Sequence, residues 1–249
     1  MSGHSKWSSI KHKKAAVDAK RGKIFTKLIR EITVASRIGG GDPDANPRLR
    51  AAIQNARGQN MPMDTVNRAI KKGTGDNDGM VYEEVIYEGF GPANVAVVIE
   101  ALTDNRNRTI ASIRTAFNKY SGSLGSANSV QYMFDRKGMF LIAQDAMDEE
   151  SLTDLVVEAG GEELEPEGED WQIICPMEEF DAVRKALEEK GLEIKESSLV
   201  RIPQNRTEIS EKEDAEMVMN FIDVLEEDDD VQKVFTNFDI DDSLLAEFS

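Results

Sequence analysis

The amino-acid sequence predicts an α+β protein, with an N-terminal three-helix domain followed by two ferredoxin-like α+β domains, one inserted into the other. Three observations support this fold class. Apolar residues recur at helical spacing through the first 75 residues, and from Val81 the apolar period changes to two. From Gly138 the elements follow the order β-α-β-β-α-β, which is typical of a ferredoxin-like domain.

The first domain, residues 1–78, is expected to be a small helical bundle. Its first helix carries Ile24, Phe25, Leu28, Ile32 and Ala35 at helical spacing and ends at Gly39–Gly41. The second helix begins with Asn46 as a cap and Pro47 in its first turn. The third covers residues 61–73, and the polar, Gly-rich segment 73–79 predicts a linker.

The second domain is expected to be discontinuous, formed by residues 79–135 plus 204–249. Its first part contains two strands joined at Gly91-Pro92, a helix over 108–122 and a strand over 129–134. A helix around 217–225 and a strand over 231–240 complete the domain from the C-terminal side. Residues 136–203 then form the inserted ferredoxin-like domain.

Charge divides the chain into two regions of opposite sign. The formal net charge is −17, yet residues 1–75 hold 16 Lys/Arg against 5 Asp/Glu, a balance of +11. The remainder holds 14 against 42, a balance of −28. Such an asymmetry predicts two surfaces with different partners, the basic one suited to a polyanion.

Within the basic region, Lys20, Lys23, Lys27 and Arg30 recur at spacings of three and four residues. In a helix they form one stripe, whose mutual repulsion phosphate groups would relieve. Trp7, among basic residues, suits stacking on an unpaired base, with packing onto the bundle as the alternative. The stripe's own alternative is a solvated face. The candidate nucleic-acid-binding residues of this region are Lys6, Trp7, Lys11, His12, Lys13, Lys14, Lys20, Arg21, Lys23, Lys27, Arg30, Arg48 and Arg50.

A second candidate cluster is the segment TDNRNRT, residues 103–109. Arg106 and Arg108 follow a predicted strand and lie near a helix N-terminus, where unpaired amides favour anions. We therefore include both arginines among the candidate nucleic-acid-binding residues. The alternative is structural, with Asp104 or Asn105 capping the helix and the arginines exposed.

Several segments resemble the YebC/PmpR family over essentially the whole chain. They are GHSKWSSIKHKKAAVDAKRGKIFTKLIREITVA, GGGDPDANPRLRAAIQNARGQNMPMDTVNRAIKKGTG, YEGFGP, TDNRNRT and FDRKG. The resemblance implies a helical domain plus two α+β domains in a probable DNA-binding transcriptional regulator. Mitochondrial relatives are translational activators, and some bacterial relatives act on ribosomes stalled at proline runs. Ala93-Asn94 and Ala127-Asn128 depart from the family's glycine-rich pattern.

Other classes of protein receive little support from the sequence. No phosphate-binding glycine motif follows a strand, and His4, His12 and Cys175 lack metal-ligand spacing, so we expect no enzyme, cofactor, metal site or small-molecule substrate. A single cysteine permits no internal disulfide and fits a reducing compartment. With no long apolar run and no secretory signal, we expect a cytoplasmic protein without membrane contact.

The sequence therefore predicts a DNA-binding transcriptional regulator that contacts nucleic acid through its basic helical domain. The main alternative is a ribosome-associated translation factor, an activator that relieves stalling at proline runs by binding ribosomal RNA. A third class is an adaptor whose acidic domains bind a basic protein partner.

Overall fold

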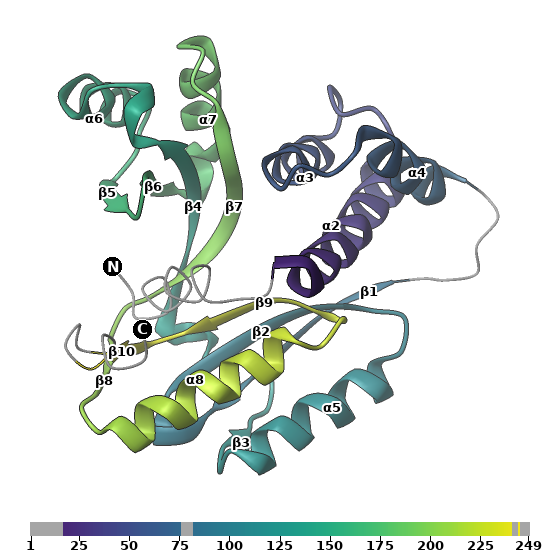
Figure 1. Ribbon diagram of the computed structural model, residues 1–249, viewed down its shortest axis with the longest axis vertical. Helices are drawn as coiled ribbons and strands as arrows, with labels where there is room; N and C mark the ends of the chain where they lie inside the picture. Colours follow the sequence, from purple (N-terminus) through teal and green to yellow (C-terminus); the bar gives the residue numbers. More distant parts are fainter. Residues whose placement is uncertain (1–16, 76–81, 241–243, 245–249) are drawn as a thin grey trace. The chain divides into compact units, whose positions relative to one another are not determined.

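The computed structural model describes residues 17–75, 82–240 and 244 of the chain, and side chains from Arg21 onward (Figure 1). The chain is divided into two compact units. Of the described residues, the first unit contains 17–27, 82–135, 202–240 and 244, and the second contains 28–75 and 136–201. The α+β class predicted from the sequence is confirmed. The division into three domains stays a prediction.

Three helices follow one another in the N-terminal region: α2 (Val17–Gly39), α3 (Pro47–Gly58) and α4 (Met63–Thr74). Asn46 caps α3, because its side-chain oxygen accepts a hydrogen bond from Leu49 N at 3.1 Å. Its buried amide also donates to the carbonyls of Ala35 and Gly40, at 2.8 and 2.9 Å. One capping side chain therefore closes both the end of α2 and the start of α3.

The apolar faces of these helices meet as the spacing predicted. Among the buried side chains are Ile32, Ala35, Leu49, Ala52, Ile53, Ala56, Val66 and Ala69. Gly73 permits the closest approach, since a Cβ there would lie 2.4 Å from the carbonyl oxygen of Thr33. The small residues of α4 thus let its backbone pack directly against α2.

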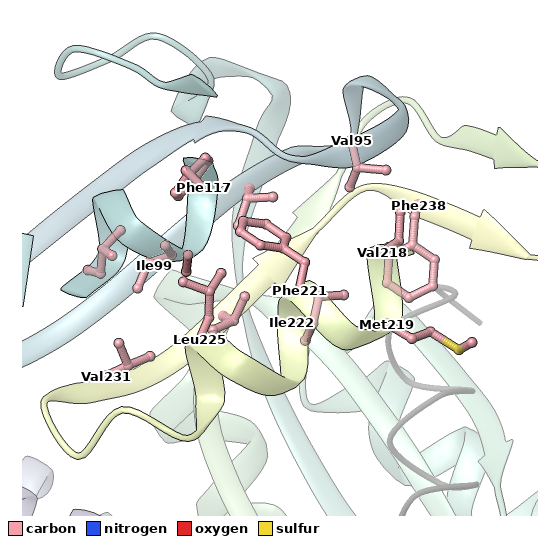
Figure 2. Packing of buried hydrophobic residues seen from close by; sticks show 14 of the residues in the cluster. Val95, Ile99, Phe117, Val218, Met219, Phe221, Ile222, Leu225, Val231 and Phe238 are labelled. Atoms are coloured by element: carbon pink, nitrogen blue, oxygen red, sulfur yellow. The ribbon is translucent and has the colours of Figure 1, made fainter. Parts of the chain in front are cut away.

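The first unit contains a four-stranded sheet in the order β3-β1-β2-β9. Its strands are β1 (Glu83–Phe90), β2 (Ala96–Thr103), β3 (Ser123–Leu124) and β9 (Val231–Thr236). Both α5 (Arg106–Lys119) and α8 (Lys212–Glu226) cover one face (Figure 1). Their side chains fill the core in Figure 2, where the rings of Phe117 and Phe221 meet edge to face at 4.9 Å.

This sheet has a ferredoxin-like strand order with an altered chain order. In a β-α-β-β-α-β domain the third strand lies between the first and the second. Here the first, second and fourth strands of the motif are β2, β3 and β9, and its two helices are α5 and α8. The position of the third strand is taken by β1, which precedes all of them in the chain. Every neighbouring pair in the sheet is antiparallel.

The second unit contains the sheet β5-β6-β4-β7, which is the ferredoxin-like order. Its strands are β4 (Phe134–Ala143), β5 (Glu163–Glu167), β6 (Asp170–Pro176) and β7 (Ile194–Pro203), of which the first two residues of β4 and the last two of β7 belong to the first unit. Two helices, α6 (Glu149–Glu158) and α7 (Phe180–Glu189), complete the β-α-β-β-α-β motif. Phe140 is fully buried and stacks on Phe180 at 4.6 Å between ring centroids.

The structure differs from the predicted strands of this region in two places. Residues 129–134 were expected to form a strand, but η2 (Gln131–Met133) is a 3-10 helix and β4 begins only at Phe134. The buried Glu88 carboxylate accepts the amides of Asn128, Val130 and Gln131, so these N–H groups are not available to a neighbouring strand. The prediction also missed the short edge strand β3.

The expected C-terminal strand over 231–240 is divided at Asn237. Its first part, β9, pairs with β2, whereas β10 (Phe238–Ile240) pairs in parallel with β8 (Thr207–Ile209). The Asn237 side chain accepts from Ala96 N at 2.8 Å and donates to Thr207 Oγ1 at 3.1 Å. It therefore fixes the point at which the chain leaves one sheet for the other.

Candidate nucleic-acid interface

The basic residues predicted from the sequence fall into several structural settings. Lys6, Trp7, Lys11, His12, Lys13 and Lys14 lie outside the described residues, and so does the side chain of Lys20. On α2, Lys23 and Lys27 lie one helical turn apart, as the stripe requires. The Arg21 guanidinium lies 5.3 Å from the centre of the Phe25 ring.

Lys23 and Lys27 of the stripe contact the C-terminal end of α8. Lys23 Nζ donates to the Glu227 carbonyl at 3.2 Å, and Lys27 Nζ donates to the Glu226 carbonyl at 2.9 Å. These carbonyls form the negative end of the helix dipole, which attracts cations. Both of these partners are backbone carbonyls at a helix end, which complement the positive charge of the two lysines.

Arg48 and Arg50 hold parts of the helical segment together. The Arg48 guanidinium binds the Glu31 carboxylate through two parallel hydrogen bonds of 2.6 and 3.0 Å, which links α3 to α2. Arg50 donates to the carbonyls of Pro43 and Asp44, at 3.0 and 3.1 Å. Its guanidinium plane is therefore fixed against the loop before α3.

The arginines of segment 103–109 support the structural alternative. Asn105 caps α5 by accepting from Arg108 N at 3.1 Å. Arg108 also binds the Asp230 carboxylate at 2.6 Å, and this hydrogen bond raises the pKa of the guanidinium. Arg106 lies 3.6 Å from Glu83 on the surface.

Asp230 is the centre of a buried polar network. Its side chain is 4% exposed and also accepts hydrogen bonds from Thr109 Oγ1 at 2.8 Å and Thr103 Oγ1 at 3.2 Å. Arg108 compensates this buried charge, and replacing it would leave the carboxylate unpaired. We therefore assign Arg108 a structural role and do not include it in the interface.

The basic residues of α4 were not among the candidates predicted from the sequence. Arg68, Lys71 and Lys72 recur at spacings of three and four on α4, the same signal that identified the stripe on α2. All three are exposed, and Arg57 is exposed near the end of α3. Among the described residues, no group lies within hydrogen-bonding distance of the side-chain nitrogens of Arg57, Lys71 or Lys72.

Two adjoining cavities lie beside these cations. The larger, about 610 Å³, has a wall of α3 residues, a wall of α4 residues and a third side from the loop before α3. The smaller, about 530 Å³, shares Asn67 and Lys71 with the larger and adds Asp64 and Arg68. We call the larger cavity the α3–α4 groove; its lining is Gly41, Pro43, Asp44, Arg50, Ile53, Gln54, Arg57, Met63, Asn67, Ile70, Lys71 and Thr74.

Over residues 17–75, 82–240 and 244, no group of three or more His, Cys, Asp or Glu side chains is arranged to hold a metal ion. No helix within the described part of the chain is both long enough and apolar enough to cross a membrane. Burial raises the pKa of the Cys175 thiol to about 11, which leaves it protonated near neutral pH.

The fold and these surfaces define a class of α+β proteins in which a basic helical segment precedes two ferredoxin-like sheets. The family model "TACO1/YebC protein N-terminal domain" matches residues 5–76, and "TACO1/YebC second and third domain" matches residues 82–238. The chain belongs to the TACO1/YebC family.

Similar proteins cover nearly the whole chain. A "Probable transcriptional regulatory protein" of Desulforapulum autotrophicum is 53% identical over 98% of both chains. One of Desulfatibacillum aliphaticivorans is 51% identical over 99% of this chain and 100% of its own. The crystal structure of a conserved hypothetical protein from Aquifex aeolicus is 45% identical, with a TM-score of 0.85, covering 92% of this chain and 94% of that one.

Proposed function

We propose that this protein regulates transcription by binding DNA through the basic residues of its N-terminal helices. The observation that carries the proposal is the contrast between a balance of +11 over residues 1–75 and −28 over the rest. The exposed cations of α4 give that charge a defined surface. The names of the similar proteins support a regulatory role.

The proposed binding energy comes largely from the release of counterions. Each Lys or Arg that neutralises a DNA phosphate releases condensed cations, which gives a slope of about −0.9 per contact in log affinity against log salt. Acidic residues elsewhere in the chain repel DNA, but screening over about 8 Å at physiological salt limits this repulsion to nearby surfaces. A polyanion is therefore expected to approach the basic helices first.

A salt titration of duplex DNA binding tests the proposal. In the full-length protein, we expect Lys71→Glu with Lys72→Glu to weaken binding and to make the salt slope shallower by about 2. The matched control is Lys185→Glu with Lys190→Glu, which makes the same charge change at exposed positions on α7 and at its C-cap. Absence of duplex binding, or equal weakening by both pairs, would contradict the proposal.

In-cell crosslinking followed by sequencing of both DNA and RNA separates this function from the translational alternative. We expect enrichment of promoter DNA over ribosomal RNA, reduced by the α4 double substitution and unaffected by the α7 control. Enrichment confined to ribosomal RNA would overturn the transcriptional role and leave the basic surface as an RNA-binding surface.

A further inference from the structure

We propose that the α3–α4 groove binds one unpaired nucleotide of a single-stranded nucleic acid. This inference rests on the proposed function, because it assigns a specific site within the basic helical segment. The groove of about 610 Å³ falls in the range of small-ligand pockets, and the described residues that line it lie between Gly41 and Thr74.

Charge identifies the kind of ligand. Among the described lining residues, Arg50, Arg57 and Lys71 contribute three positive charges, against one carboxylate from Asp44. Among the described residues, nothing lies within hydrogen-bonding distance of the side-chain nitrogens of Arg57 and Lys71. These two cations are therefore available to a phosphate group of the ligand.

The remaining lining suits a flat heterocycle. Ile53, Met63 and Ile70 provide an aliphatic surface. The Arg50 guanidinium, fixed by the carbonyls of Pro43 and Asp44, offers a planar group on which a base can stack. Bases within a duplex are paired and stacked on both sides, so the expected occupant has an exposed base.

The decisive experiment compares two neighbouring lysines of α4. Lys71 lines the groove, whereas Lys72 does not, and both are exposed. Using full-length protein and labelled 12-nucleotide single strands of DNA and of RNA, we expect Lys71→Glu to weaken binding at least tenfold more than Lys72→Glu. With a 12-base-pair DNA duplex, we expect the two variants to differ by less than twofold.

Methyl NMR provides a readout that does not depend on any substitution. We expect a dinucleotide to shift the methyl signals of Met63 and Ile70 in the wild-type protein, while an acidic peptide of equal charge leaves them unchanged. Shifts caused equally by the peptide would overturn the nucleotide assignment in favour of a protein segment.

Failure of this inference can be distinguished from failure of the proposed function. If Lys71→Glu and Lys72→Glu weaken single-strand and duplex binding equally, the groove is not a nucleotide site, while general DNA binding stands. If the wild-type protein binds no nucleic acid of any form, the proposed function fails as well.

Discussion

Asn55 and Ser197 exchange two hydrogen bonds. Asn55 Nδ2 donates to the Ser197 carbonyl at 3.0 Å, and Ser197 N donates to Asn55 Oδ1 at the same distance. The Asn55 side chain on α3 thus forms the two hydrogen bonds that a neighbouring strand would form with β7. Strand β7 lies at the edge of the β5-β6-β4-β7 sheet. Within the second unit, α3 is thereby attached to β7.

Replacing Asn55 by Ala should lower the free energy of unfolding by about 1–3 kcal/mol, because Ser197 is buried and its backbone groups lose both partners. Chemical denaturation gives this value, and amide exchange should show faster exchange at Ser197. The control is Gln59→Ala at the exposed end of α3. Unchanged exchange at Ser197 would show that the pairing does not form.

Gly58 and Gly22 should respond in opposite directions to replacement by Ala. Both lie in helices, where Ala is favoured over Gly by about 1 kcal/mol. A Cβ at Gly22 has open space, whereas one at Gly58 would lie 2.3 Å from the Lys195 carbonyl oxygen. We expect Gly22→Ala to raise the melting temperature and Gly58→Ala to lower it, and an increase in both would contradict this close contact.

Glu88 should make stability depend on pH in the acidic range. Burial by itself raises the pKa of its carboxyl, but hydrogen bonds from the amides of Val130 and Gln131 and from the Gln131 side chain outweigh it and hold the pKa below 4.5. A lowered folded-state pKa stabilises the fold at any pH above the ordinary pKa of Glu. This contribution to the free energy of unfolding is lost as pH falls through the folded-state pKa.

The comparison with Glu88→Gln measures that contribution. At pH 7 we expect the variant to be less stable by about 1.5–3 kcal/mol, since the lost hydrogen bonds involve a charged acceptor. Urea denaturation from pH 7 to pH 3 should show this difference shrinking as pH falls from 4.5 through the lower folded-state pKa, because the carboxyl is protonated first in the unfolded chain and then in the folded protein. A difference that stays constant over that range would refute the role of the charge.

Replacing Ala93 by Gly should increase the stability of the protein. It has φ 52° and ψ 27°, the left-handed region that costs an L-residue about 1–2 kcal/mol. Its partly buried methyl packs against the core, so part of the gain is lost. We expect Ala93→Gly to stabilise the protein by about 0.5 kcal/mol, and Asn94→Ala, also at positive φ, to destabilise it. Thermal unfolding of both variants checks the sign.

Local sequence patterns predicted most helices and strands, because amphipathic spacing and caps such as Asn46 are encoded by neighbouring residues. The misassigned segment 129–134 depends instead on Glu88, some forty residues earlier in the sequence. The break at Asn237 depends on Ala96 and Thr207, which are 141 and 30 residues away in sequence. Long-range side-chain hydrogen bonds of this kind leave no periodic signal.

The candidate interface shows a similar limit. Spacing correctly placed Lys23 and Lys27 together, yet it could not show that both contact the end of α8. The salt bridges of Arg48 and Arg108 also depend on the folded chain. By contrast, the cations of α4 could have been found, since Arg68, Lys71 and Lys72 repeat at helical spacing.

The altered chain order of the first sheet has a consequence for biosynthesis. Strands β1 and β2 leave the ribosome well before β9, although Val97 on β2 pairs with Thr236 on β9. The apolar face of the β1–β2 hairpin therefore stays exposed while residues 136–201 are synthesised. During this delay we expect the nascent chain to bind chaperones that shield exposed strands.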